Sequence, residues 1–305
     1  MKNNYVLMIA IVAVMILGAG CSKDDDEYSN ADLTVKTNIS KYELTKSITT
    51  AFDNSVIGVY VDDVDGVYNP TTNSTASVTT GGASITPSPS ITINEDATVY
   101  AWFPATENEL TNPESTSEKA IDIVTTDDFA ATDQTDYLWA TPTDVSKTSI
   151  NADLNFHHAL SKVVFSIVKD DNFEGTTLTS ISISSTENTF LTGTGTMGID
   201  DGTISGLTAV NSLSYTNDDG ITISTTENEV VALVAPTTLS GTITITLEVD
   251  GESYSSTISE SEWAAATQYT YNLSLKGSAG GELTIGSATI SGWEIGSEFD
   301  ITFDE

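Results

Sequence analysis

Apolar and polar residues alternate along many short stretches of the chain. Over residues 97–103, Val99, Ala101 and Phe103 occupy every second position. Because successive side chains of a β-strand point to opposite faces, this alternation predicts a strand with one buried face. The strongest apolar stretch spans residues 156–168. The same pattern predicts further strands at residues 55–61, 178–184, 230–235, 241–249, 268–275 and 299–303.

Turn-forming residues separate these stretches, and helical periodicity is rare. Only residues 260–266 resemble a short helix, which we expect to be a connection. Many short strands joined by Gly-, Asn- and Asp-rich turns are typical of antiparallel sandwiches. Weak periodicity over residues 142–151 suggests a boundary. We therefore predict an all-β protein with two antiparallel β-sandwich domains in tandem, over residues 31–150 and 151–276.

The first residues have the layout of a lipoprotein signal peptide, which we assign to residues 1–20. Lys2 precedes an apolar stretch over residues 5–17 and the small residues 18–20. That stretch is too short to cross a bilayer as a helix, which takes about 20 residues. Cys21, the single cysteine, follows directly and is the predicted lipidation site. The alternative is an ordinary cleaved signal with a chance cysteine, although that thiol would lack a disulfide partner.

An acidic segment follows, and we expect residues 21–30 to be a solvated tether. Residues 22–27 resemble the export tag that sends Bacteroidetes lipoproteins to the outer face of the outer membrane. The whole chain holds 44 acidic and 10 basic residues and has a formal net charge of −34. Nucleic-acid binding depends on lysine and arginine neutralising phosphates, so this charge balance excludes a nucleic-acid partner.

The end of the chain, residues 277–305, combines a Gly-rich spacer with an apolar tail. In the tail, Phe299, Ile301 and Phe303 alternate with polar residues, so they predict a strand with one apolar face. Such a tail must be buried against protein. It either completes the sheet of its own domain or packs on another molecule.

Several short motifs resemble, in order, the fimbrillin family of Bacteroidetes. The most specific is the run from Phe156 to Ile167, which contains His158, Leu160, Ser161 and Lys162. The others are spread over almost the entire chain after Cys21: residues 45–52, 57–60, 100–104, 136–140, 234–236, 269–275 and 290–293. The resemblance implies a subunit of a pilus, or a pilus-associated surface protein, that serves cell adhesion. It also implies transthyretin-like topology for the two sandwich domains.

The family further implies assembly by strand donation between like or related pilin subunits. A protease removes the leader and the first strand, here residues 31–46, and a strand of the next subunit fills the hydrophobic groove. The candidate donor strand is the tail with Phe299, Ile301 and Phe303. The matching cleavage position holds Lys46 where well-known members have arginine, and this chain has no arginine. Without a lysine-tolerant protease, the chain would stay whole as an anchor or a monomeric surface lipoprotein.

The sequence gives little sign of catalysis, so we predict no enzymatic activity, no cofactor and no metal site. The acidic residues lie mostly in turns, where they cap backbone groups. His157 and His158 are adjacent on a strand and point to opposite faces, so they cannot grip one metal together. We expect one to be packed and the other exposed.

The main alternative function is glycan binding by a surface lipoprotein that does not polymerise. Trp102 and Trp139 lie in apolar strands and are expected in the core. Trp263 lies among polar residues and is the candidate glycan contact. The expected location is the same in both cases: the cell outer membrane, with acyl chains such as palmitate on Cys21, and for a pilin also the fimbrium.

Overall fold

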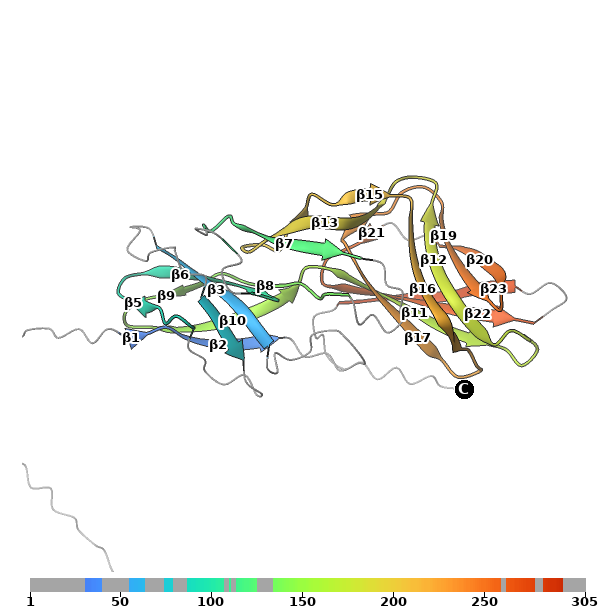
Figure 1. The fold of residues 1–305 in the computed structure, drawn as a ribbon, viewed down its shortest axis with the longest axis horizontal. Coiled ribbons are helices and arrows are strands. Elements are labelled where there is room, and N and C mark those ends of the chain that lie inside the picture. The colour runs from blue at the N-terminus through green and yellow to red at the C-terminus, as the bar shows by residue number, and fades with distance from the viewer. Residues whose placement is uncertain are drawn as a thin grey trace, which may run out of the picture.

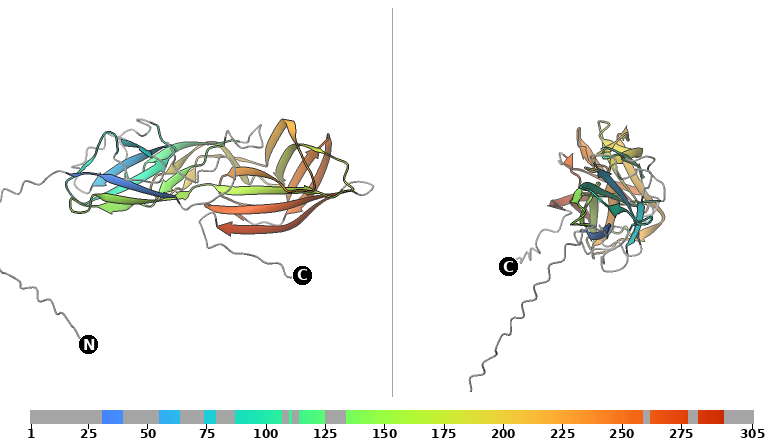
Figure 2. Two further views of the ribbon diagram at one scale, coloured as in Figure 1. Left: turned by 90° about the horizontal axis from the view of Figure 1, so that it is seen from below. Right: turned by 90° about the vertical axis from the view of Figure 1, so that its left-hand side faces the viewer.

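The computed structural model describes residues 31–39, 55–63, 74–78, 87–106, 110, 114–124, 134–258, 262–277 and 282–292. These residues form strands and turns (Figure 1), which confirms the predicted all-β class. Within them, no helix is long and apolar enough to span a membrane. The molecule is elongated, with an N-terminal and a C-terminal half arranged end to end (Figure 2).

The N-terminal half is built on one seven-stranded sheet. Its strand order is β2-β10-β8-β6-β3-β4, and β9 pairs with the remaining part of β6. Residues from strands far apart in this sheet share one buried cluster, including Val35 of β2 and Ile57 of β3, so the sheet curls around its own core. The strands are β2 (Thr34–Ile39), β3 (Ser55–Asp63), β4 (Ser74–Val78), β6 (Ala97–Phe103), β8 (Leu138–Ala140), β9 (Thr143–Val145) and β10 (Asn151–His158). A separate pair joins β1 (Ala31–Asp32) to β5 (Thr92–Ile93).

The C-terminal half is a sandwich of two four-stranded sheets. Alternate residues from both sheets, such as Phe165 and Ile181, meet in one buried cluster between them. One sheet has the order β17-β11-β22-β23: β17 (Asn228–Val234), β11 (Ser161–Lys169), β22 (Thr267–Lys276) and β23 (Glu282–Gly292). The other has the order β16-β12-β19-β20: β16 (Ser212–Thr222), β12 (Thr177–Ser185), β19 (Ile243–Val249) and β20 (Glu252–Ile258).

Smaller sheets connect the two halves or close their ends. β7 (Glu118–Ile123) comes from the N-terminal part of the chain but pairs over six residues with β13 (Phe190–Gly198). Beside it, a mixed cluster holds buried residues from both parts, including Trp102, Leu160 and Met197. β13 also pairs with β14 (Ile204–Ser205) and β15 (Thr208–Val210), and β18 (Thr237–Thr238) pairs with β21 (Glu262–Trp263).

Three details differ from the sequence-based expectation. The helix expected over residues 260–266 is wrong, because Glu262 and Trp263 form β21 and a turn follows, with Ala266 at φ 52°. β10, which we assigned to the C-terminal domain 151–276, is hydrogen-bonded within the N-terminal sheet instead. The sheets are not purely antiparallel, since β2 is parallel to β10 and β11 is parallel to β22. Parallel pairing needs long connections, and each pair is separated by about a hundred residues of intervening chain.

Candidate strand-exchange sites

β2 is an edge strand, and it is the strand that the resemblance marks for removal. It is hydrogen-bonded within the sheet only to β10, in parallel register from Thr34↔Asn151 to Ile39↔Phe156. Two backbone bonds secure its start: the Leu33 N–H donates to the Ile91 carbonyl at 2.7 Å, and the Thr34 N–H to the Ile150 carbonyl at 3.1 Å. An edge strand can leave without splitting the sheet that it borders.

Loss of β2 would leave an apolar groove along β10. Leu33 and Val35 are fully buried, and so are Ala152 and Leu154, which β10 contributes to the same core. Full burial of one Val or Leu side chain stabilises a fold by about 1.5–3 kcal/mol. The unpaired backbone of β10 would add a further cost. Such a groove therefore favours a replacement strand with apolar residues at alternate positions.

β23 is the edge strand of the other half and belongs to the segment that the sequence assigns to the tail. It pairs antiparallel with β22 from Thr267↔Gly292 to Lys276↔Glu282, with a register shift between Tyr271 and Leu273. The first part of the tail therefore completes the sheet of its own half, which was one of the two alternatives. Since β23 ends its sheet, it also can detach without dividing that sheet.

The remaining predicted positions of the processing and export pathway lie outside the described residues. These are Cys21, Lys46 and the three apolar positions of the distal tail, Phe299, Ile301 and Phe303. Lipidation, cleavage and the donor role of the distal tail therefore stay predictions.

The most specific sequence motif lies where the two halves meet. His158 is buried, and its Nδ1 is 3.0 Å from Oδ1 of Asp136, a carboxylate whose side chain is 1% exposed. Asp136 belongs to a second motif, residues 136–140, so the fold joins two family motifs through one hydrogen bond. The Ser161 hydroxyl donates to the Ala264 carbonyl at 2.6 Å, fastening the start of β11. His157 is half-buried on the opposite face, next to Trp139.

Lys162, which belongs to the same motif, is a buried lysine. Burial lowers its pKa, while the nearby carboxylates of Glu229 and Asp136 act in the opposite direction. A second lysine of this region, Lys119 of β7, is 4% exposed, and its Nζ lies 5.9 Å from the ring centroid of Tyr137. The motif thus anchors the β10–β11 connection on both sides: His158 contacts the segment before β8, and Ser161 contacts the turn after β21.

Gln134 makes a contact that the sequence did not predict. Its amide Nε2 donates to the Val231 carbonyl at 3.2 Å, and its Oε1 accepts a hydrogen bond from the Leu233 N–H. These two groups lie on the free edge of β17, so the side-chain amide occupies the place of a neighbouring strand. Tyr137 makes a similar contact with Asp122, since its hydroxyl accepts from the Asp122 N–H at 2.9 Å. Nothing in the sequence around Gln134 distinguishes it from a surface residue.

The prediction that Trp263 is an exposed glycan contact is wrong. Its side chain is 1% exposed, its Nε1 donates to the Tyr271 hydroxyl at 3.0 Å, and its ring stacks on Phe190. Glu262, the other residue of β21, is exposed, while the Trp263 indole turns inward. Trp102 is fully buried, as expected, and Trp139 is half-buried.

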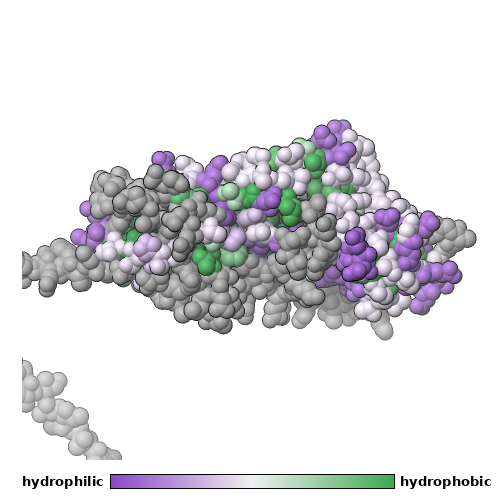
Figure 3. All heavy atoms as spheres, in the orientation of Figure 1, coloured by the Kyte–Doolittle hydropathy of each residue, from purple (hydrophilic) through white to green (hydrophobic). Residues whose placement is uncertain are grey.

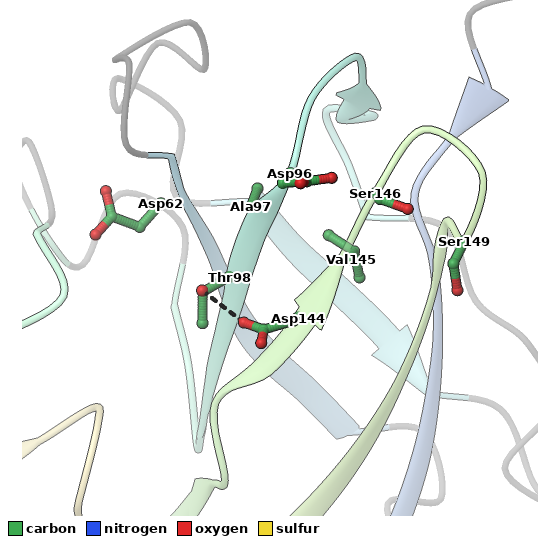
Figure 4. A pocket seen from close by; sticks show the side chains of 8 residues that line it. All are labelled: Asp62, Asp96, Ala97, Thr98, Asp144, Val145, Ser146 and Ser149. Carbon is green, nitrogen blue, oxygen red and sulfur yellow. Dashed lines mark hydrogen bonds between the residues drawn. The ribbon is translucent and has the colours of Figure 1, made fainter.

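A hollow of about 480 Å³ lies at the distal end of the N-terminal sheet (Figure 4). It is lined by Asp62, Asp96 and Asp144 together with small side chains, both polar and apolar. The Thr98 hydroxyl donates to the Asp144 carboxylate at 2.9 Å, and the three carboxylates point in different directions. No two of them face each other across the hollow. Among the described residues, no group of three or more acidic, His or Cys side chains is arranged to hold a metal.

The sequence of the chain matches the model of the fimbrillin-like family over residues 27–293. The chain belongs to the fimbrillin-like family. No curated protein matches the sequence. The family assignment therefore depends on the family model, which covers both halves of the molecule.

Solved structures of similar fold come from species of Bacteroides. A proposed cell adhesion protein from Bacteroides ovatus has 17% identity and a TM-score of 0.61, covering 88% of this chain and 100% of its own. Another from Bacteroides uniformis has 17% identity and a TM-score of 0.62, with 86% and 99% covered. A fimbrial protein from Bacteroides vulgatus has 15% identity and a TM-score of 0.52, with 86% and 99% covered. At these identities the comparison shows a shared fold and nothing more.

Proposed function

We propose that this member of the fimbrillin-like family is a pilus-type subunit, or a pilus-associated surface lipoprotein, that serves cell adhesion. It has no enzymatic activity and needs no cofactor. Its two halves correspond to tandem sandwich domains of transthyretin-like topology, and its partners are like or related subunits. The fimbrial protein and the proposed adhesion proteins of similar fold support this function.

The proposed assembly is strand exchange. Export as a lipoprotein acylated on Cys21 brings the chain to the outer face of the outer membrane, and cleavage after Lys46 releases β2. A strand from the tail of the next subunit, ending with Phe299, Ile301 and Phe303, then fills the groove along β10. One observation carries this proposal: β2 and the tail strand β23 each border a sheet and each pair with a single neighbour in it.

Analysis of the protein taken from the cell surface tests the proposal. We expect a mature N-terminus at Ser47 and detergent-resistant ladders on a gel. Lys46→Ala should abolish both, while Lys36→Ala, the matched control, should leave processing intact. An acylated Cys21 on a whole chain without ladders would contradict the shaft subunit. That result would favour an anchor, or the glycan-binding lipoprotein that no longer has Trp263 as its contact.

A further inference from the structure

We propose that β10 and β11 form a load-bearing spine along the molecule, and that the parallel β11–β22 pair is its mechanical clamp. The inference depends on the strand exchange proposed above for its role in a fibre, but the clamp itself is a property of the single chain. It starts from the position of the two strands. β10 ends at His158 and β11 begins at Ser161, so only Ala159 and Leu160 separate them.

The spine connects both candidate exchange sites. On one side, β10 is the strand that pairs with β2, and so forms the wall of the groove that an incoming strand would fill. On the other side, β11 pairs with β22, and β22 leads through residues 277–281 into the tail. Tension in a chain of subunits would therefore enter at β10, pass along the backbone into β11, and leave through the C-terminal end of β22.

The direction of the strands decides how this tension acts on the clamp. β11 and β22 are parallel, from Lys162↔Gln268 to Lys169↔Leu275. Both run away from the N-terminal half (Figures 1 and 2). Tension pulls β11 back through its N-terminal end and pulls β22 forward through its C-terminal end. The two strands are thus loaded in shear, and the hydrogen bonds of the whole eight-residue register resist together.

Water is kept away from the clamp. The first seven residues of β11 are all buried, including Lys162, Val164 and Ser166, which point away from the sandwich core. β17 covers the other edge of β11 over seven residues. A backbone hydrogen bond shielded on both faces is hard for water to replace, because a solvent molecule cannot reach the donor and acceptor as they separate.

The exit of β22 is fastened to the end of β11. The Gly277 N–H donates to the Asp170 carboxylate at 2.9 Å, and the Asp170 N–H donates to the Leu275 carbonyl at 2.9 Å. A Cβ on Gly277 would lie 1.8 Å from the Asn172 carbonyl oxygen, so the backbone here is in close contact with the β11–β12 loop. A force applied at residue 277 therefore acts first on the last pair of the β11–β22 register, Lys169↔Leu275.

Single-molecule pulling on residues 21–305 with Cys21→Ser tests the clamp. Cysteine handles at Lys147→Cys and Lys276→Cys, both exposed positions, load β11 and β22 in shear. Handles at Asp171→Cys and Lys276→Cys are the matched control, because they pull adjacent strand ends apart and break the bonds one by one. We expect a rupture force several-fold higher for the first pair. Equal forces, or a lower force in shear, would overturn the proposal.

Native-state hydrogen exchange on the unmodified chain gives a second test that needs no variant. The amides of β11 should be the slowest to exchange, slower than those of β12, the central strand of the facing sheet. Faster exchange in β11 than in β12 would also overturn the clamp. A chain that forms ladders but ruptures at equal force in both geometries would refute the clamp and leave strand exchange standing. A higher rupture force in shear, in a chain that never forms ladders, would support the clamp and refute strand exchange.

Discussion

At the scale of single residues, the burial of Trp263 shows how polar neighbours in the sequence can conceal a core position. The indole fills the end of the C-terminal sandwich between Phe190 and the Tyr271 hydroxyl. Glu262 before it and Ala265 in the turn after it are both exposed. The residue therefore contributes to stability, and its contribution can be measured.

Trp263→Ala should lower the free energy of unfolding by about 3–5 kcal/mol, because it leaves a cavity and removes the hydrogen bond to the Tyr271 hydroxyl. The measurement is urea unfolding followed by circular dichroism. Thr257→Ala, an exposed strand position, is the control and should change stability by less than about 0.5 kcal/mol. A loss for Trp263→Ala as small as that of the control would contradict the buried position.

The buried tyrosines predict a loss of stability at alkaline pH. Burial raises the pKa of Tyr215 far above its ordinary value. In the unfolded chain a tyrosine loses its proton near pH 10, whereas folded Tyr215 keeps it. The unfolded state then binds fewer protons, so stability is complete below about pH 10 and falls above it. Tyr215→Phe should make this fall shallower in urea unfolding between pH 8 and pH 11, and an unchanged slope would argue against the assignment.

At the scale of elements, most strands were predictable because period-two alternation survives wherever one face is buried. The strands over residues 55–61, 97–103 and 241–249 all appear in the structure. The pairing partners were not predictable, since alternation tells which face is buried but not which strand lies alongside. For this reason β10 was assigned to the wrong half, and the contacts of Gln134 and Asp136 were missed.

Gly58 also shows that the sequence does not tell which side chain of a neighbouring strand lies opposite a residue. Gly58 lies in the middle of β3, opposite Trp102 of β6, and a Cβ there would be 2.1 Å from the Trp102 Cε2 atom. Gly58→Ala should therefore push the indole out of place and cost about 1–3 kcal/mol, as overpacking usually does. Thermal unfolding checks this, with Asp153→Ala, an exposed position of β10 in the same sheet, as the control. Gly58→Ala with unchanged stability would mean that Trp102 can move freely.

At the scale of the whole molecule, the two halves are joined by several kinds of contact. They share the cluster around Trp102 and Met197, the β7–β13 pair, and the bidentate contact of Gln134 with the edge of β17. Figure 3 shows apolar residues among polar ones over the middle of the described surface, between the two halves. The halves are therefore expected to unfold as one unit.

Gln134→Ala should release the edge of β17 locally. We expect faster hydrogen exchange at the Leu233 amide, by about tenfold if one net hydrogen bond of about 1–1.5 kcal/mol is lost. Gln134→Glu is the informative second variant, because a carboxylate still accepts from the Leu233 N–H but cannot donate to the Val231 carbonyl. The Leu233 amide should therefore exchange more slowly in Gln134→Glu than in Gln134→Ala. Equal exchange in all three proteins would show that the amide is held by other contacts.

The pairing of β7 with β13 and of β11 with β22 has a consequence for how the protein is made. β7 must wait for about seventy further residues before its partner exists, and β11 for about a hundred. During synthesis the emerging chain therefore cannot finish folding until almost all of it is present. A chain that folds so late would be able to cross a membrane while still unfolded. Until it folds, its unpaired strands would need protection from pairing with other chains.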